Sequence, residues 1–358
     1  MCCGHLMRWV DDRDRSLLTR NGWITFTRGY YHCPCCGRGA APADDACQVP
    51  PGRASWPVRE GVAMLGAWVP FREVAQVYAH LTGHAISHTS AEDWTETLGA
   101  AYVPPTLDRY APGPVVDTLF LQADGVMVQF LDGWHEVKVV VCWGRKDGED
   151  LPPRYLTAHG VSWEELTEQI AALARQMGVR QAGEVVCMAD GALPIWALFR
   201  RLFPQARHLL DWFHLQEHLA TVARLLPEGA AWHEAQKAAL AERGPAETRA
   251  ALVALATAPP DPADALQQAA QKCLNYLEAN ADRLDYPTAR ALGLPIGTGR
   301  IESACRHVVQ QRCKQPGMRW KPEHLDWVLG ARCAYLNNDW ALAVKQMIAK
   351  AATAAKAA

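Results

Sequence analysis

Residues 185–219 constrain the fold of this chain more than any other stretch. They read VVCMADGALPIWALFRRLFPQARHLLDWFHLQEHL. One apolar run stops at Asp190 and Gly191, an amphipathic segment follows, and a second apolar run leads to Asp211 and His214. Apolar runs of this length between turn residues are typical of buried strands. Catalytic acids in open α/β sheets usually lie where such strands end, so these two strand ends are the first place to look for chemistry.

The neighbouring segments continue this alternation of strand and helix. We predict strands at 115–128, 135–143 and 154–158, a helix at 163–178, and then strand 185–189, helix 195–203 and strand 207–212. Ser162 is the expected helix cap, and Asp124-Gly125 interrupts the first strand signal. This order favours an α/β fold with a mixed five-stranded sheet, as in the ribonuclease H fold. In that fold the first and fourth strands are neighbours, which would place Asp124 opposite Asp190.

Local composition divides the chain further. The predicted regions are 1–50, zinc-ribbon-like; 51–114, helical, ending in a Pro-rich linker; 115–214, the first part of the ribonuclease H-like core; 215–293, an all-helical insertion; 294–345, the final core helix; and 346–358, a low-complexity tail that we expect to fray. The formal net charge is −2, so any contact with nucleic acid must rest on local basic patches. Because no apolar run approaches the length of a membrane span and no signal-peptide pattern is present, we expect a cytoplasmic protein without a membrane partner.

Cysteines crowded into the first 50 residues predict a metal site. Cys33-x-x-Cys36 followed by glycine has the spacing of half a zinc knuckle, because its turn directs two thiolates at one ion. The other half is incomplete, with only Cys2 and Cys3 before a glycine. The expected Zn²⁺ ligands are Cys3, Cys33 and Cys36, which His5 or His32 could complete. The alternative is a knuckle that has lost part of its first half and binds zinc poorly or not at all.

A predicted hairpin precedes the knuckle, and a predicted pair of helices precedes the Pro-rich linker. Turn residues and alternation in RNGWITFTRGYY, residues 20–31, indicate a β-hairpin. Farther along, apolar residues recur at helical spacing from Phe71 to Leu81, Thr82-Gly83 breaks the run, and a second helix restarts near Ser87. This pattern resembles a helix-turn-helix, which would bind DNA, although any short helical hairpin has a similar pattern.

Three carboxylates stand out in this order of elements: Asp124 in the first strand, Asp190 at the end of the fourth, and Glu302 on a late helix after the Gly297–Gly299 loop. Oxygen ligands of this kind hold Mg²⁺ or Mn²⁺, usually together with substrate phosphate. Two such ions about 4 Å apart can activate a water or 3′-hydroxyl and stabilise the leaving oxygen of a phosphodiester. Each acid alone has an ordinary alternative, a turn or a salt bridge. Together they favour a site for phosphoryl transfer.

The region after Glu302 is locally basic. Six Lys or Arg residues lie between Arg300 and Lys321, against the single acid Glu302. Such a run would neutralise the phosphates next to a cleaved bond. The residues that we expect to contact DNA are Arg300, Arg306, Arg312, Lys314 and Arg319.

Several long motifs resemble the DDE transposases of bacterial insertion sequences, most closely the ISKra group, with Mutator-like relatives behind it. The motifs are ADG at 123–125, ADGA at 189–192, LDWFHLQEHL at 210–219 and GRIESACRHVVQQRCKQPGMRW at 299–320. The likeness extends over nearly the whole chain and includes GYYHCPCCG and LTGHAISHTSAEDW. The family's zinc ribbon usually has two complete CxxC pairs, whereas this chain begins inside the first, as a truncated ribbon would.

The resemblance implies an activity and roles for individual residues. Asp124, Asp190 and Glu302 would be the catalytic, metal-binding triad, and Asp211-x-x-His214 would match the supporting (C/D)xxH motif. The protein would cut DNA at element ends, using Mg²⁺ or Mn²⁺, and join the 3′-hydroxyl to target DNA. Its partners would be the terminal repeats and target DNA, on which it would act as a homo-oligomer associated with the bacterial nucleoid.

Two other classes of function stay open. An inactive or domesticated transposase-derived protein would bind the element ends without cutting them. A ribonuclease H-like nuclease would hydrolyse DNA but join nothing. His214 and His218, one helical turn apart, could also form a metal pair, although a hydrogen-bonding role near the acids is favoured for His214.

Overall fold

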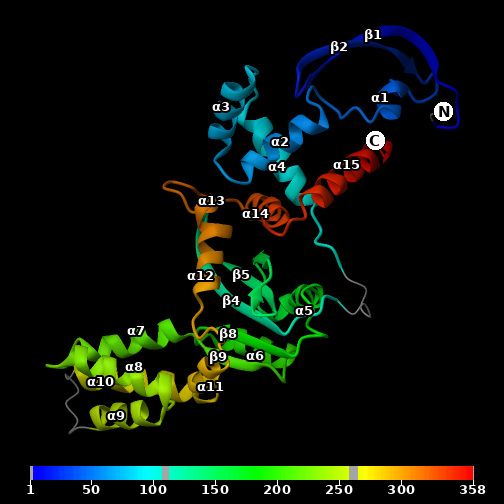
Figure 1. Cartoon of the computed structure of the whole chain (residues 1–358). Coiled ribbons are helices and arrows are strands. Elements are labelled where there is room, and N and C mark those ends of the chain that lie inside the picture. Colours follow the sequence, from blue (N-terminus) through cyan, green and yellow to red (C-terminus); the bar gives the residue numbers. More distant parts are fainter. Residues whose placement is uncertain (1–2, 107–112, 258–264, 358) are drawn as a thin grey trace. The chain divides into compact units, whose positions relative to one another are not determined.

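The computed structural model describes residues 3–106, 113–257 and 265–357, which belong to two compact units (Figure 1). One unit combines both ends of the chain, Met1–Pro104 and Gln311–Ala358, and we call it the terminal unit. The other, Pro105–Gln310, is the sheet unit. The predicted segment 294–345 is therefore divided between the two units.

A six-stranded mixed sheet lies at the centre of the sheet unit. Its strands are β4 (Thr118–Phe130), β5 (Gly133–Lys146), β6 (Glu149–Asp150), β7 (Arg154–His159), β8 (Glu184–Ala189) and β9 (Arg207–Leu210). The order across the sheet is β6-β5-β4-β8-β9, and β7 also pairs with β5. Strands β4, β5 and β7 are antiparallel neighbours, whereas β8 and β9 run parallel to β4. The predicted mixed α/β sheet is thus confirmed, with the short β6 as an additional strand.

The first strand is continuous through Asp124-Gly125, so the predicted interruption there is wrong. Asp124 pairs with Val139 and Gly125 with Lys138, in a register that extends to the end of β4. Glycine fits position 125 because the side chain of Glu136 lies close to it: a Cβ atom there would be 2.1 Å from Glu136 Oε1. Asp124 therefore lies inside a long strand, which continues beyond the end of β8.

Helices lie against both faces of the sheet. On one face, α5 (Thr167–Gln176) and α6 (Leu193–Leu202) share a hydrophobic core with Leu119, Leu121 and Ala123 of β4. Side chains alternate along a strand, so Gln122 and Asp124 point to the opposite face. There α12 (Gly299–Ala304) packs on β4 and β5 and continues into the π-helical segment η3 (Cys305–Gln310).

The helix predicted at 163–178 starts with a 3₁₀ turn, η1 (Glu164–Leu166), before α5. Ser162 caps it as predicted: its Oγ accepts from Glu165 N at 3.3 Å, while Ser162 N donates to Glu165 Oε2 at 2.6 Å. This reciprocal pair is a capping box, which gives hydrogen-bond acceptors to two backbone amides at the helix start. Gly178 follows the helix with a φ of 93°, a conformation that favours glycine.

The fifth strand is shorter than the predicted 207–212. Asp211 caps α7 (Trp212–Ala223), because its side chain accepts from His214 N at 3.0 Å, so the helix begins at Trp212. In the described residues of the insertion all regular elements are helices, and they form one group beyond β9 (Figure 1). The further helices are α8 (Gly229–Glu242), α9 (Ala246–Ala256), α10 (Ala265–Ala279), η2 (Ala281–Arg283) and α11 (Tyr286–Ala291).

The terminal unit begins with a hairpin, a long curved pair of strands (Figure 1), but the predicted range 20–31 covers only its turn and second strand, and the first strand lies before it. Its elements are β1 (Arg8–Thr19), β2 (Gly22–His32), β3 (Gly39–Ala40), α1 (Pro42–Ala46), α2 (Trp56–Gly66), α3 (Phe71–Thr82) and α4 (His88–Ala101). Gly83, with a φ of 71°, ends α3, and Ser87 caps α4 by accepting from Ser90 N at 3.0 Å. The two helices therefore lie where the sequence predicts them, although Leu81 is 72% exposed at the end of the expected apolar face.

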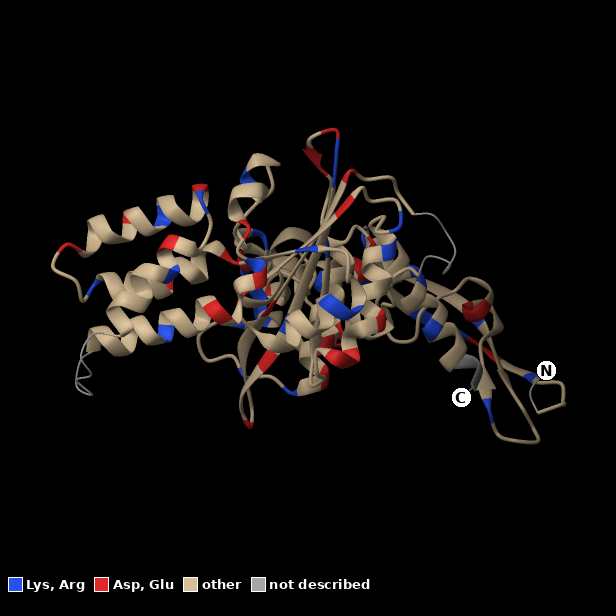
Figure 2. Ribbon diagram, turned by 90° about the horizontal axis from the view of Figure 1, so that it is seen from below, with Lys and Arg blue, Asp and Glu red and all other residues tan. Residues whose placement is uncertain are grey.

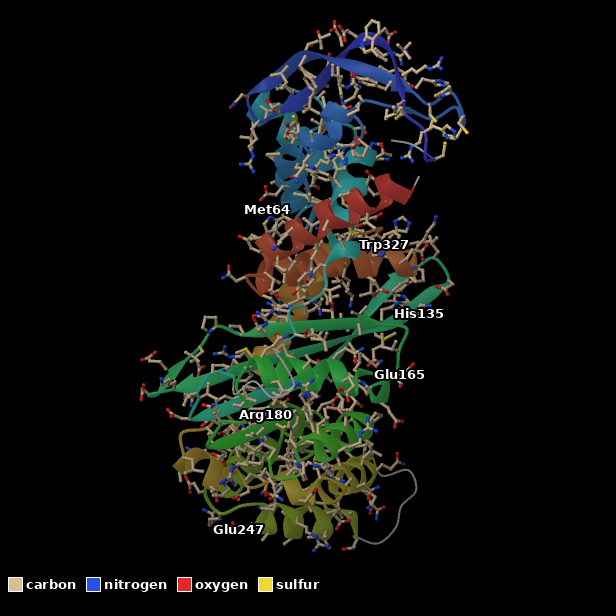
Figure 3. All side chains as sticks on the ribbon, turned by 90° about the vertical axis from the view of Figure 1, so that its right-hand side faces the viewer. Met64, His135, Glu165, Arg180, Glu247 and Trp327 are labelled. Carbon is tan, nitrogen blue, oxygen red and sulfur yellow. The ribbon has the colours of Figure 1, made fainter. Side chains whose placement is uncertain are left out.

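The carboxyl-terminal part of this unit is α13 (Gln311–Cys313), α14 (Pro322–Leu336) and α15 (Trp340–Ala357). Glycines allow α4 and α14 to approach closely: a Cβ atom at Gly99 would lie 1.7 Å from the carbonyl oxygen of Trp327, which Figure 3 labels on α14. Helix packing thus joins segments from opposite ends of the chain.

The expectation of a frayed tail at 346–358 is wrong for the residues that α15 covers. Alanine-rich sequence has high helix propensity, and the helix is also anchored by packing. Ala343 and Met347 are buried in one cluster with Leu98 and Ala101 of α4. No helix in the described part of the chain combines the length and apolarity needed to cross a membrane.

Met347→Ala should lower the free energy of unfolding by about 2–3 kcal/mol, because it leaves a cavity where a side chain only 1% exposed packs. The matched control is Lys345→Ala, on the exposed side of the same helix, which should change the free energy by less than about 0.5 kcal/mol. Urea denaturation measures both values. Equal effects of the two substitutions would show that α15 does not pack as described.

Candidate functional site

One acid lies on β4 and a second directly follows the neighbouring parallel strand β8. Gln122 of β4 pairs with Met188 of β8. Asp124 and Asp190 each lie two residues farther along, so both side chains belong to the same face at the carboxyl end of β8. Neighbouring strands are only about 4.8 Å apart. The two acids that the sequence analysis paired are therefore brought together by this register.

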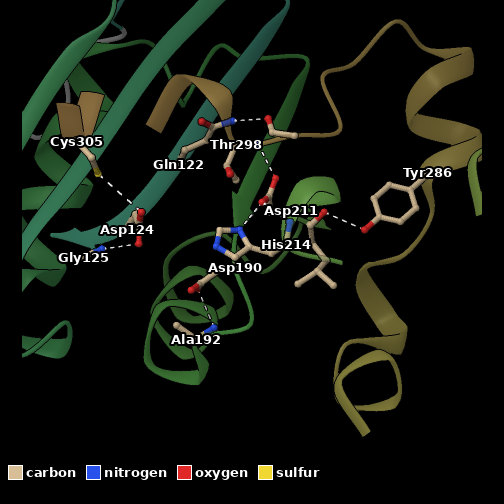
Figure 4. A network of polar contacts seen from close by, with 12 residues as sticks. Gln122, Asp124, Gly125, Asp190, Ala192, Asp211, His214, Tyr286, Thr298 and Cys305 are labelled. Atoms are coloured by element: carbon tan, nitrogen blue, oxygen red, sulfur yellow. Dashed lines mark hydrogen bonds and ion pairs between the residues drawn. The ribbon is translucent and has the colours of Figure 1, made fainter. Parts of the chain in front are cut away.

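The carboxylate of Asp124 is half-buried and has two contacts. Oδ1 accepts from Gly125 N at 2.7 Å, and Oδ2 lies 3.8 Å from Cys305 Sγ (Figure 4). Burial raises the pKa of Asp124, the Gly125 amide opposes this, and the charge of Asp190 raises the pKa further. Asp190 Oδ1 accepts from Ala192 N at 2.9 Å. A carboxylate whose charge is disfavoured by a neighbouring carboxylate is a suitable ligand for a bound cation.

Asp211 continues the row of acids, because Ala189 pairs with Leu210, and Asp190 and Asp211 follow directly after β8 and β9. Its carboxylate is fully buried and accepts from Thr298 N at 2.7 Å, from His214 N and from the His214 imidazole (Figure 4). Burial alone would raise the pKa of Asp211, but these hydrogen bonds outweigh it and the pKa is lowered.

His214 is the cation of this site. Its hydrogen bond to Asp211 raises its pKa to about 9, although burial works in the opposite direction. The charge of Asp190 adds to this effect, and the imidazolium in turn lowers the pKa of Asp124. Within this ion pair, which has no net charge, the imidazolium of His214 is the positive group that acts on Asp124 and Asp190.

Glu302 lies in the first turn of α12, after the glycine loop, as predicted, and its side chain is exposed. It precedes Cys305 by one helical turn. Burial raises the pKa of the Cys305 thiol, and the charges of Asp124 and Glu302 raise it further. Among the described residues, however, Asp124, Asp190 and Glu302 do not form a group whose ligand atoms all lie within 4.8 Å. A pair of ions about 4 Å apart would tolerate such a wider spacing.

Two residues of this site were missed from the sequence. Gln122 is buried and hydrogen-bonds the loop that leads to Glu302, and Tyr276 of α10 packs its ring on Gly191, where a Cβ atom would lie 2.5 Å from Tyr276 Cε2. A glutamine in the apolar run TLFLQADGV was a visible signal for the first. No local signal marked Tyr276, because its contact depends on how the helical insertion folds back.

The predicted DNA-contacting residues fall into different environments. Arg300 pairs with Asp150 and lies 4.5 Å above the Trp143 ring, and Arg306 is exposed. In the terminal unit Lys314 and Arg319 are exposed.

Arg312 is 0% exposed and lies in the interior. The prediction that it contacts DNA phosphate is therefore wrong for this structure. Arg312 donates to Gly66 O at 2.9 Å and lies 4.8 Å from the Phe71 ring.

Basic and acidic residues are interspersed along the ribbon (Figure 2), in keeping with the near-neutral net charge.

The terminal unit holds a cysteine cluster that could bind a metal ion such as zinc. The sulfur atoms of Cys3, Cys33 and Cys36 all lie within 4.8 Å of one another, and sulfur atoms gather in this region in Figure 3. The sulfur atoms of Cys3 and Cys33 are 3.6 Å apart, close to the roughly 3.8 Å between two thiolate sulfurs on one tetrahedral zinc. The backbone amides of Cys36 and Cys35 lower the pKa of Cys33 to about 6, which favours the thiolate.

Two further ligands lie at this cluster. His5 and Cys35 form an overlapping group with Cys3, so either could complete a four-ligand site. His32, the other histidine considered, does not belong to a group of this kind among the described residues. Cys2 lies outside the described residues.

Another group of metal-ligating residue types joins two helices of the terminal unit. Nδ1 of His324 in α14 lies 2.7 Å from Oε1 of Glu96 in α4 and 3.9 Å from Oε1 of Glu92. Burial raises the pKa of Glu96, and the His324 contact opposes this. This group is an interhelical pair that compensates a buried acid.

Comparison of the chain with models of protein families and with curated proteins found no match. The site is therefore interpreted from its own geometry.

His214→Gln should lower the free energy of unfolding at about pH 6 and have little effect at about pH 10. Because the pKa of His214 is raised to about 9 in the folded protein, its contribution is fully present below the ordinary value of about 6.5 and is lost as pH rises through 9. The side chain is 42% exposed, so solvent screening reduces the expected effect to about 1 kcal/mol. Urea denaturation across this pH range measures it. The control is His80→Gln, an exposed histidine of α3, and the same pH dependence in both variants would contradict the prediction.

Metal analysis of the purified protein should find about one zinc per chain, bound at the cysteine cluster. Cys33→Ser should remove this zinc, because it replaces the buried thiol at the centre of the cluster. Cys47→Ser is the matched control, an exposed cysteine outside the cluster, and should retain the metal. Wild-type protein without zinc, or Cys33→Ser protein with a full complement, would refute the zinc site.

Proposed function

We propose that the protein is a metal-dependent DNA transposase that cuts DNA at insertion-sequence ends and joins the 3′-hydroxyl to target DNA. The observation that carries the proposal is the register of β4 and β8, in which Asp124 and Asp190 each lie two residues after the paired residues Gln122 and Met188. The activity is the one implied by the resemblance of the ADG, ADGA and GRIES motifs to DDE transposases.

The strand arrangement supports a ribonuclease H-like core. Among the five longer strands, the first and fourth, β4 and β8, are neighbours, and the first three pair antiparallel. The fourth and fifth strands run parallel to the first, with helices on both faces. This is the arrangement that the ribonuclease H fold requires, and in it the acids of the first and fourth strands form the catalytic centre.

The donor set fits divalent hard cations. Asp124, Asp190 and Glu302 would hold Mg²⁺ or Mn²⁺, which prefer carboxylate oxygens and complete their coordination with water and substrate phosphate. Ions held in this way supply Lewis-acid activation of the attacking hydroxyl and stabilisation of the leaving oxygen.

The chain itself would provide charge and order around this centre. The imidazolium of His214, held by Asp211, offsets part of the negative charge of the acids and would favour the approach of a phosphate. Arg306, exposed four residues after Glu302, can contact the DNA backbone near the cut. The cysteine cluster and the α3–α4 pair of the terminal unit would contribute to recognition of the element ends.

Asp190→Asn and Glu302→Gln should each reduce strand transfer by more than about 100-fold in Mg²⁺, exceeding the typical effect of groups that only support metal ligands. The assay uses DNA that carries the inverted repeats flanking the gene, and it scores joined products separately from nicks. The control is Asp132→Asn, whose side chain in a hairpin turn is 72% exposed and which should keep wild-type activity.

The same assay separates the rival functions. A nuclease would give metal-dependent nicks without joined products, and an inactive derivative would bind the repeats without nicking them. Strand transfer that survives in Asp190→Asn and Glu302→Gln would refute the proposed metal site.

A further inference from the structure

Gln122 is a buried amide that connects β4 to the loop carrying Glu302. The side chain is 1% exposed. Its Nε2 donates to Gly297 O at 3.3 Å (Figure 4) and lies 3.7 Å from Met188 Sδ. Its Oε1 accepts from Ile301 N at 2.8 Å. One side chain therefore holds both ends of the 297–301 segment.

This contact takes the place of a helix cap. Helix α12 begins after Thr298, whose side chain makes no capping hydrogen bond. The amide of Ile301, in the first turn, would otherwise have no acceptor within the helix. Gln122 accepts it from a different element, so the start of α12 is positioned by β4.

A second strand end holds the same loop. Asp211, after β9, accepts from Thr298 N at 2.7 Å, and Trp212 N donates to Ile296 O at 3.0 Å. The ring of Phe213 lies against Gly297, where a Cβ atom would be 2.6 Å away. With one side anchored by Asp211 and the other by Gln122, the loop has little freedom to shift.

The position of Gln122 couples this anchoring to the acids. Gln122 and Asp124 are two residues apart on one strand and point to the same face. On the other side of the contact, Glu302 is the residue directly after Ile301. A single amide thus joins the strand of the first acid to the helix of the third.

We propose that Gln122 is a positioning residue that sets the placement of Glu302 relative to Asp124 and thereby the affinity of the site for divalent metal. The inference rests on the proposed function, since it takes these two acids as metal ligands. Gln122 is not one of the proposed metal ligands, so its loss should weaken metal binding while leaving the ligands themselves intact.

Mn²⁺ binding to the full-length protein without DNA, measured by titration calorimetry, tests this inference. Gln122→Met keeps the side-chain length but removes both hydrogen bonds, and it should raise the dissociation constant on the order of 10- to 100-fold. Strand transfer should fall at low Mn²⁺ and return to the wild-type rate at saturating Mn²⁺. The matched control is Gln129→Met, a half-buried glutamine on the same strand, which should leave both measurements unchanged.

A second variant keeps the test decisive if Gln122→Met does not fold. Gln122→Asn retains the amide but is one carbon shorter, so it cannot reach both Ile301 and Gly297, and it should shift metal affinity in the same direction. The inference is overturned if the folded variants bind Mn²⁺ within about twofold of wild type, or if saturating Mn²⁺ does not restore strand transfer.

Asp124→Asn in the same titration separates this inference from the proposed function. If Asp124→Asn loses Mn²⁺ binding and Gln122→Met does not weaken it, only the role of Gln122 is wrong. If Asp124→Asn itself binds Mn²⁺ like wild type, the proposed metal site is wrong and the inference about Gln122 is overturned with it.

Discussion

The parallel pairing of β4 with β8 is the constraint on which the acidic site depends. Parallel strands keep a fixed register, so the pairing of Gln122 with Met188 determines that Asp124 lies beside Asp190 rather than a residue away on the other face. Apolar side chains of both strands are packed against α5 and α6, and this core holds the register. A slip by one residue would bury the acids in that core, at a large cost in desolvation.

Buried polar groups connect the paired strands to the loop and helix that carry Glu302. Asp211 and Gln122 are nearly inaccessible to solvent, and each is satisfied by backbone amides of the 297–301 segment. A buried polar group without a partner costs roughly 1–3 kcal/mol, so these contacts restrict the loop strongly. The helix carrying Glu302 is placed by hydrogen bonds from two strands, although Glu302 is more than 170 residues from Asp124 along the chain.

Much of the fold could be predicted from local patterns. The five longer strands, the Ser162 cap, the helical insertion and the glycine loop before Glu302 follow from apolar periodicity and capping chemistry, which depend on neighbouring residues. The errors share a cause. The tail at 346–358 was expected to fray because its composition is simple, but Met347 packs on α4, and Arg312 was expected on the surface because it is charged, but it is enclosed by Phe71 and the backbone of α2.

The sequence by itself determined which residues are candidates for chemistry: the acids Asp124, Asp190 and Glu302, the Asp211–His214 pair, and the thiols Cys3, Cys33 and Cys36. These are visible because polar or thiol groups stand out against apolar runs and turns. Only the tertiary structure decided which of them are neighbours, that Gln122 joins two of their elements, and that Arg312 lies inside. Register and burial depend on contacts between residues distant in the chain, and no local pattern records them.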